Sequence, residues 1–295
     1  MLKKFITIFI SFIFILNVNA EELKTSVTNN INKDLTNSLN EHLTSGLGKF
    51  FPTAEVTLSS GKTQKVKGNV LVVSPLSDIN DTKNVTFTQG SIYFSDGNRE
   101  TLNLGIGKRK LLNNDTLMLG ANLFYDHELD YDHQRASLGI EAISSVASLR
   151  ANQYYGLSGW KTGVGGTQEK ALYGNDIELG APLPYLPWTN FYLRSFNWEG
   201  ASGTADLKGD EMSLEAKLPF GLNVEVGKRS NDGNTKDRKF LNLTWTCCNK
   251  KDEPNFGISD KAYNLTSVAD QRFQKVRRQN LIVKQQDLDL TVIGF

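Results

Sequence analysis

Cysteine is almost absent from this chain, which has only Cys247 and Cys248 among its 295 residues. Adjacent cysteines cannot link distant parts of a chain, and no Cys-X-X-Cys or Cys/His metal spacing is present. The sequence therefore excludes a disulfide scaffold and a cysteine-based metal centre. We interpret the pair as the end of a strand, with a redox or intermolecular role as the alternative.

Long apolar runs and an excess of charge of either sign are also missing. Hydrophobic residues make up 39% of the chain, and mean hydropathy is −0.35. Outside the first twenty positions no segment is apolar enough for a spanning helix, which needs about 20 such residues. The net charge of +1 creates no general field toward nucleic acid or anionic lipid. We expect no nucleic-acid partner, and nothing in the sequence predicts a cofactor.

The N-terminus carries the clearest local signal. Lys3 and Lys4 precede an apolar run at residues 5–16, and Val18-Asn19-Ala20 suits cleavage. This pattern predicts a secretory signal peptide at residues 1–20 and Sec-dependent export. An uncleaved anchor is the alternative, but the run is shorter than a spanning helix needs. Residues 21–50 are polar and read as a periplasmic lead-in.

What the rest of the chain has is an apolar–polar alternation with a period of two. In "LFYDHELDYDHQRASLGIEAI" (residues 123–143), Leu138 and Ile140 fall on one side of the second strand, and Arg135 and Glu141 fall on the other. We find about twelve such segments between residues 51 and 248, spaced by about 16 residues, which fits membrane strands of ~9 to 11 residues with short links.

The connections alternate in length as well. Compact links such as "ISSV" and "PFG" take turns with long polar ones such as "GLSGWKTGVGGTQEK". Outer-membrane barrels have short periplasmic turns and long extracellular loops. The pattern predicts an all-β transmembrane antiparallel barrel with lipid on the apolar side, a watery lumen on the charged side and no open sheet edge.

Several ordered motifs resemble one family. They are "FTQG" at 87–90, "NLGIG" at 103–107, "LGANLFYDH" at 119–127, "HQRASLGIEA" at 133–142, "LSGWK" at 157–161, "YGNDIELGAPLPYLP" at 173–187 and "RFQKVRRQNLIVK" at 272–284. Over residues 45–285 the chain resembles the β-barrel domain of inverse autotransporters, the intimin and invasin family of Gram-negative cell-adhesion proteins.

The resemblance implies a twelve-stranded outer-membrane barrel that carries an exported passenger. It also implies that the C-terminal part, residues 249–295, re-enters the lumen as a helix followed by a linker. Because the chain stops at Phe295, we expect its own passenger to be absent and leave any passenger or surface receptor unidentified. Expected partners are outer-membrane lipid, the barrel-assembly machinery and periplasmic chaperones.

The predicted plug is residues 266–284, which have too few large apolar residues to pack on a soluble core. A helix polar all round needs a polar enclosure. The lumen offers one, although the inward phase is mixed in charge and individual pairings stay open. The candidate plug residues are Arg272, Lys275, Arg277, Arg278 and Asn280, facing Glu141, Asp176, Glu178, Glu215 and Glu225 on the wall.

Other motifs are weaker indications of function. "DHELDYDH" (residues 126–133) gathers acids and two histidines that would suit a cation or an outer-membrane protease. It lacks the Gly-centred spacing of a calcium loop, so we interpret it as a solvated loop. Trp160, Trp188 and Trp198 lie near strand ends, where aromatic girdles meet headgroups. No catalytic or metal residue is assigned.

We therefore expect a non-enzymatic translocation and anchoring unit in the outer membrane. The alternative is a stand-alone small channel or structural barrel, and an enzyme barrel comes third.

Overall fold

The computed structural model describes residues 51–61, 64–95, 99–232, 237–247, 257–286 and 292–293. The predicted signal peptide, the lead-in and Cys248 lie outside these residues. The barrel strands are β1 (Thr53–Gly61), β2 (Gln64–Pro75), β3 (Asn84–Ser95), β4 (Arg99–Leu112), β5 (Leu117–Glu128), β6 (His133–Ile143), β7 (Ser148–Gly156), β10 (Gly174–Leu183), β11 (Leu186–Trp198), β12 (Leu207–Lys217), β13 (Leu222–Asn231) and β14 (Arg238–Cys247). The short elements are β8 (Lys161–Thr162), η2 (Val164–Gly166), β9 (Gln168–Ala171), η3 (Pro219–Gly221), η4 (Ala269–Gln271), β15 (Lys284–Gln286) and β16 (Val292–Ile293).

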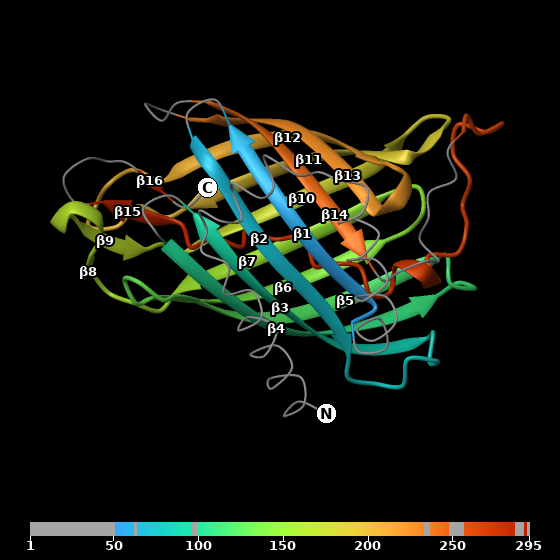
Figure 1. Cartoon of the computed structure of the whole chain (residues 1–295), viewed down its shortest axis with the longest axis horizontal. Helices are drawn as coiled ribbons and strands as arrows, with labels where there is room; N and C mark the ends of the chain where they lie inside the picture. Colours follow the sequence, from blue (N-terminus) through green and yellow to red (C-terminus); the bar gives the residue numbers. More distant parts are fainter. Residues whose placement is uncertain are drawn as a thin grey trace, which may run out of the picture.

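The twelve barrel strands close into a single antiparallel sheet (Figure 1). β1 completes the circle by pairing with β14, with Ala54 opposite Cys247 and Val56 opposite Trp245. Closure pairs the backbone groups that an open sheet would leave exposed in lipid. The predicted twelve-stranded antiparallel barrel is confirmed.

The alternation of the sequence sorts side chains between the two sides of the wall. In β6, Arg135 and Glu141 point inward and are 0% and 6% exposed, whereas Leu138 and Ile140 point outward and are 51% and 65% exposed. The period-two geometry of a strand produces this division directly. The charged side of the hairpin at residues 123–143 is therefore the buried side, as a barrel with a polar lumen requires.

The connections between strands lie at the two ends of the barrel. The residue types in the tight turns explain how the chain can reverse there. At one end, here the turn end, lie residues 76–83, 113–116, 144–147, 184–185 and 218–221. Asn113, Asn114 and Asp115 all adopt positive φ there, a conformation that Asn and Asp tolerate best among non-glycine residues. Gly221 has φ +74°, and a Cβ atom at that position would lie 2.0 Å from the carbonyl oxygen of Thr246.

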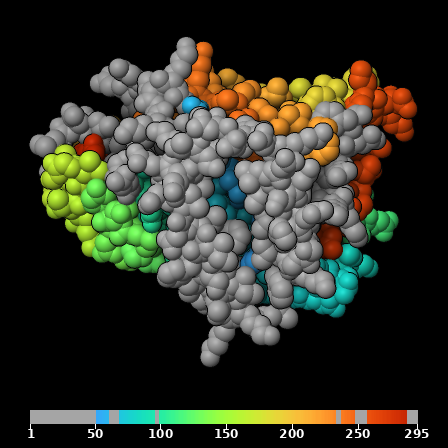
Figure 2. Space-filling model, viewed as in Figure 1, coloured from blue at the N-terminus to red at the C-terminus, as the bar shows by residue number. Residues whose placement is uncertain are grey.

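The opposite end, here the loop end, carries the longest connection, residues 157–173. This connection holds β8 and β9, which join β15 and β16 in a separate four-stranded sheet. Figure 2 shows the same connection, in yellow-green, projecting at the left of the molecule.

Residues 266–286, here the lumen segment, run through the barrel without forming the predicted helix. Apart from the single turn η4 they are irregular until β15, and the described residues contain no α-helix. The prediction was wrong because side chains of the wall bond the segment's backbone, as described below, so helical hydrogen bonds are not needed to satisfy it. No helix in the described residues is long and apolar enough to cross a membrane.

Candidate functional site: the lumen segment and its ion pairs

The lumen segment crosses the barrel from the turn end to the loop end. At the turn end, the Val268 N–H donates to the Asp115 carbonyl at 2.7 Å. At the loop end, β15 pairs with β9, with Lys284 opposite Ala171. Figure 1 shows this path, with η4 (red) at the right and β15 beside β9 at the left. One stretch of chain thus contacts connections at both ends of the barrel.

Two arginines of the wall hold the segment by its backbone. Arg109 Nη1 donates to the carbonyls of Arg272 and Gln274 at 2.8 and 2.7 Å. Arg135 Nη2 donates to the Gln279 carbonyl at 2.6 Å. Both arginine side chains are 0% exposed. These bonds fix an extended backbone in a fixed register, because they depend on where each carbonyl lies.

Uncharged residues of the wall also form hydrogen bonds with the segment's backbone. The Val276 N–H donates to Gln89 Oε1, and the Gln279 N–H donates to the Tyr154 hydroxyl, each at 2.8 Å. From β1, Thr53 Oγ1 donates to the Phe273 carbonyl at 2.8 Å. A buried backbone group without a partner is costly, so these contacts are needed if the segment is to lie in the lumen.

A fully buried ion pair lies midway along the segment. Arg278 binds Asp126 through two bonds, Nη1 to Oδ1 at 2.8 Å and Nη2 to Oδ2 at 2.6 Å. Arg135 Nε donates to the same Oδ2 at 2.8 Å. All three side chains are 0% exposed. The Arg278 guanidinium also lies 4.4 Å from the centre of the Phe124 ring, a stacked arrangement favourable for a planar cation.

Arg277 points to the other side of the lumen. Its Nε bonds Glu178 Oε1 at 2.9 Å, its Nη2 bonds Glu225 Oε1 at 3.0 Å, and its guanidinium lies 3.7 Å from the Tyr192 ring centre. Glu178 also binds Arg150 and Arg194 of the wall. Neighbouring basic residues therefore connect the segment to opposite walls, since Glu225 lies on β13, six strands around the barrel from β5, which carries Asp126.

The remaining candidate residues have the following contacts. Lys275 pairs with Glu55, Asn280 donates to the Tyr93 hydroxyl, and Arg272 donates to the carbonyls of Ala269 and Ile79; Glu141 pairs with Arg109, Asp176 accepts from Asn152 and Tyr154, and Glu215 accepts from Tyr192. Of the five acidic wall residues proposed as partners, only Glu178 and Glu225 pair directly with basic residues of the segment.

Sequence reasoning missed Asp126 as the main partner of the segment because it assigned residues 126–133 to a loop. β5 extends to Glu128, and Asp126, Glu128 and His133 are buried inward-facing residues. Of these charged residues and histidines, only Asp130 and Asp132 lie in the solvated loop that was expected, and His127 lies in β5 with its side chain 31% exposed. The inward phase of Asn122 and Phe124 contained the missing signal, because it continues through Asp126.

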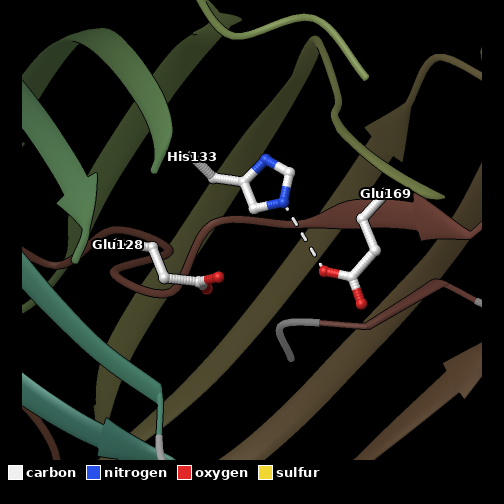
Figure 3. A group of neighbouring side chains, drawn as sticks. All are labelled: Glu128, His133 and Glu169. Carbon is white, nitrogen blue, oxygen red and sulfur yellow. Dashed lines mark ion pairs between the residues drawn. The ribbon is translucent and has the colours of Figure 1, made fainter. Parts of the chain in front are cut away.

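At the loop end, Glu128, His133 and Glu169 lie together (Figure 3). Arg99 bridges the two carboxylates, bonding Glu128 at 2.6 Å and Glu169 at 2.7 Å, and Lys284 of the lumen segment bonds Glu128. Burial alone would raise the pKa of Glu169, but the neighbouring side chains of His133, Gln286 and Arg99 lower its pKa to about 2. The cluster is thus charged, buried and tied to the segment.

Trp198 is another correction, because it does not belong to an outer girdle. It is 2% exposed and packs in a loop-end apolar cluster with Tyr154 and Val283 of the lumen segment. Trp160 packs against the same cluster. Trp198 therefore lies in the same apolar cluster as the lumen segment's Val283 instead of facing headgroups.

A cavity of about 240 Å³ remains beside the lumen segment. Its lining includes Glu55, Arg194 and Asn242 of the wall and Lys275 and Arg277 of the segment. The lumen is therefore not completely filled.

Comparison with known proteins agrees with this architecture. Residues 13–280 match the family model described as "Inverse autotransporter, beta-domain". The chain is 38% identical over 144 residues to a putative attaching and effacing protein homolog of Escherichia coli (strain K12), covering 48% of this chain and 47% of that one. It is 26% identical over 249 residues to the inverse autotransporter adhesin YeeJ of the same strain, covering 79% of this chain and 10% of YeeJ.

The fold has a counterpart among solved structures. A structure described as "Unveiling the Mechanism Behind the in-meso Crystallization of Membrane Proteins" matches with a TM-score of 0.67 at 22% identity, covering 80% of this chain and 99% of that one. This likeness supports the fold. The chain spans about half of one curated relative and a tenth of the other, so the activities of those whole proteins do not transfer automatically.

Proposed function

Because this chain belongs to the inverse autotransporter β-domain family, we propose that its barrel anchors an exported polypeptide and that the lumen segment is the path of that polypeptide across the membrane. The chain is an outer-membrane β-barrel unit. The observation that carries the proposal is the course of residues 266–286 from the turn end to the sheet at the loop end.

The proposed orientation has the loop end at the cell surface. It rests on the lengths of the connections, since outer-membrane barrels keep short turns in the periplasm. Thr53 at the start of β1 and Cys247 at the end of β14 then both lie on the periplasmic side. A polypeptide that follows the lumen segment emerges outside the cell, where an adhesin acts.

Anchoring is explained by the buried bonds of the segment. A pull on the chain beyond Gln286 has to break the Arg278–Asp126 and Arg277–Glu178 pairs inside the lumen. Breaking a buried pair by removing one partner typically costs about 3–5 kcal/mol. The proposed role is mechanical and non-enzymatic, with barrel-assembly machinery and periplasmic chaperones as partners in biogenesis and lipid around the outer face.

Deletion of residues from 266 onward tests the proposal in planar bilayers. The truncated chain should still shift in mobility on heating, as folded barrels do, and should conduct far more than the full chain. In the full chain, a cysteine replacing Val276, which is 2% exposed, should resist a water-soluble maleimide, whereas one replacing the exposed Ser202 should react. Equal conductance together with rapid labelling at position 276 would contradict the proposal.

A stand-alone channel is the second candidate, favoured by the cavity of about 240 Å³ beside the segment. This function requires a steady conductance from the full chain in the absence of any partner. The same bilayer recordings of the full chain distinguish a channel from an anchoring unit with a filled lumen.

A further inference from the structure

Three potential metal ligands meet where β5, β6 and β9 come together at the loop end (Figure 3). Glu128 ends β5, His133 begins β6, and Glu169 lies in β9. One ligand atom from each lies within 4.8 Å of the other two. Their side chains are 3%, 0% and 0% exposed. One imidazole and two carboxylates form a donor set that Zn²⁺ accepts.

The position of His133 is further evidence for a cation site, beyond that of the two carboxylates. Its Nε2 atom is buried, has no hydrogen-bond partner within the described part of the chain, and faces Glu169 Oε2 at 3.5 Å. Its Nδ1 atom lies 3.4 Å from Ser158 Oγ, the kind of second partner that commonly orients a metal-bound histidine. A nitrogen that faces a buried carboxylate oxygen in this way is suited to share a cation with it.

The spacing is close to that of a tetrahedral site. Zinc bonds of about 2.0–2.2 Å place neighbouring ligand atoms about 3.3 Å apart. The pair His133 Nε2 and Glu169 Oε2 is near that value at 3.5 Å. Since the ligand atoms lie within 4.8 Å of one another, Glu128 has to approach by at most about 1.5 Å. Arg99 bonds Glu128 Oε1 and both oxygens of Glu169, so a cation bound to Glu169 Oε2 shares that oxygen with the guanidinium.

Lys284 is the group that competes with a metal ion. Its ammonium bonds Glu128 Oε2, while Arg99 holds the other oxygen of that carboxylate. With Lys284 present, two carboxylates face two cations and the group is neutral. Without Lys284, a net charge of −1 remains buried beside the His133 nitrogen. A buried unpaired charge is costly, so the site then favours a divalent cation.

We propose that Glu128, His133 and Glu169 form a divalent-cation site of zinc type, which the Lys284 ammonium closes when the lumen segment is in place. The ion and the ammonium compete for the same carboxylate. Metal binding therefore opposes docking of β15 on β9, because Lys284 is the first residue of β15.

The test is a titration of folded, tag-free protein in detergent with Zn²⁺ alone, measured by equilibrium dialysis and elemental analysis. The Lys284→Met variant should bind one Zn²⁺ per chain at least about tenfold more tightly than the wild type. Adding His133→Gln to that variant should weaken binding by at least about tenfold, because even the loss of an outer partner of a ligand commonly costs that much. Heat-dependent mobility checks folding of each variant.

If Lys284→Met does not fold, the comparison is made between wild type and His133→Gln at higher Zn²⁺, where only the wild type should bind. Zinc binding that is insensitive to His133→Gln, or no tighter in Lys284→Met than in wild type, overturns the proposal. Co²⁺ in place of Zn²⁺ should give a tetrahedral visible spectrum without a thiolate charge-transfer band. A thiolate band would assign the metal to the cysteines and would also overturn it.

Discussion

Replacing Asp126 with asparagine removes the charge that holds Arg278 and Arg135 together. The carboxylate accepts two bonds from Arg278 and one from Arg135, and all three side chains are 0% exposed. In Asp126→Asn, two guanidinium groups remain buried without their counter-charge. Removal of one partner from a buried pair costs about 3–5 kcal/mol, so we expect a loss of stability of that size.

The assay is reversible urea unfolding in lipid vesicles, followed by tryptophan fluorescence and by heat-dependent mobility. The midpoint should fall while the dependence on urea stays the same, because the surface exposed on unfolding does not change. Asp132→Asn is the matched control. Asp132 lies in the same hairpin and pairs with Lys161, but its side chain is 53% exposed, so solvent screens the pair and the midpoint should hardly move.

A double variant sharpens this test. Adding Arg278→Met to Asp126→Asn removes one of the two unpaired guanidinium groups, so the double variant should be more stable than the sum of the single effects predicts. If Asp126→Asn and Asp132→Asn lower the midpoint equally, or if the effects of Asp126→Asn and Arg278→Met simply add, the ion pair does not hold the segment and the reasoning is wrong.

Three further outcomes follow from the wall and its connections. Leu214→Arg places a charge on the lipid face near mid-strand and should destabilise the barrel by about 2–4 kcal/mol, whereas Glu215→Gln on the inner face should be nearly silent in the same unfolding assay. At the turn end, hydrogen bonds from the backbone N–H groups of Asn84 and Lys83 lower the pKa of Asp81. Its contribution is present above the unfolded pKa of about 3.8 and is lost as pH falls through the lower folded pKa. Protease cleavage in residues 76–83 should therefore be faster in Asp81→Asn than in wild type at neutral pH, with the difference disappearing in strong acid.

Much of the wall could be predicted from the sequence because one local rule governs it. Side chains of a strand alternate, so Ile140 and Glu141 had to face opposite sides, and the predicted signal peptide favoured lipid on the apolar side. Strand number followed from the same alternation. Strand ends were less certain, because Asp126 and Glu128 are as polar as a loop and only the continued phase marks them as inward.

The conformation of the lumen segment could not be predicted in the same way. Its hydrogen-bond partners are side chains more than a hundred residues away, as with Val276 and Gln89 or Arg278 and Asp126. Composition predicted a polar enclosure for this segment, but it could not predict whether the backbone would bond to itself or to the wall. That choice depends on the positions of Arg109 and Arg135, which only the closed barrel brings to the segment.

Disulfide trapping tests the course of the segment most directly. Gln285 in β15 lies opposite Lys170 in β9, and Cα atoms of such antiparallel pairs are about 4.5–5.5 Å apart, within the range of a disulfide. Cysteines at 285 and 170 should therefore crosslink spontaneously in the folded outer-membrane protein, whereas cysteines at 285 and at the turn-end Ser145 should not, as read by peptide mass mapping. A crosslink from 285 to 145, or none to 170, would contradict a segment that crosses the lumen from the turn end to the loop end.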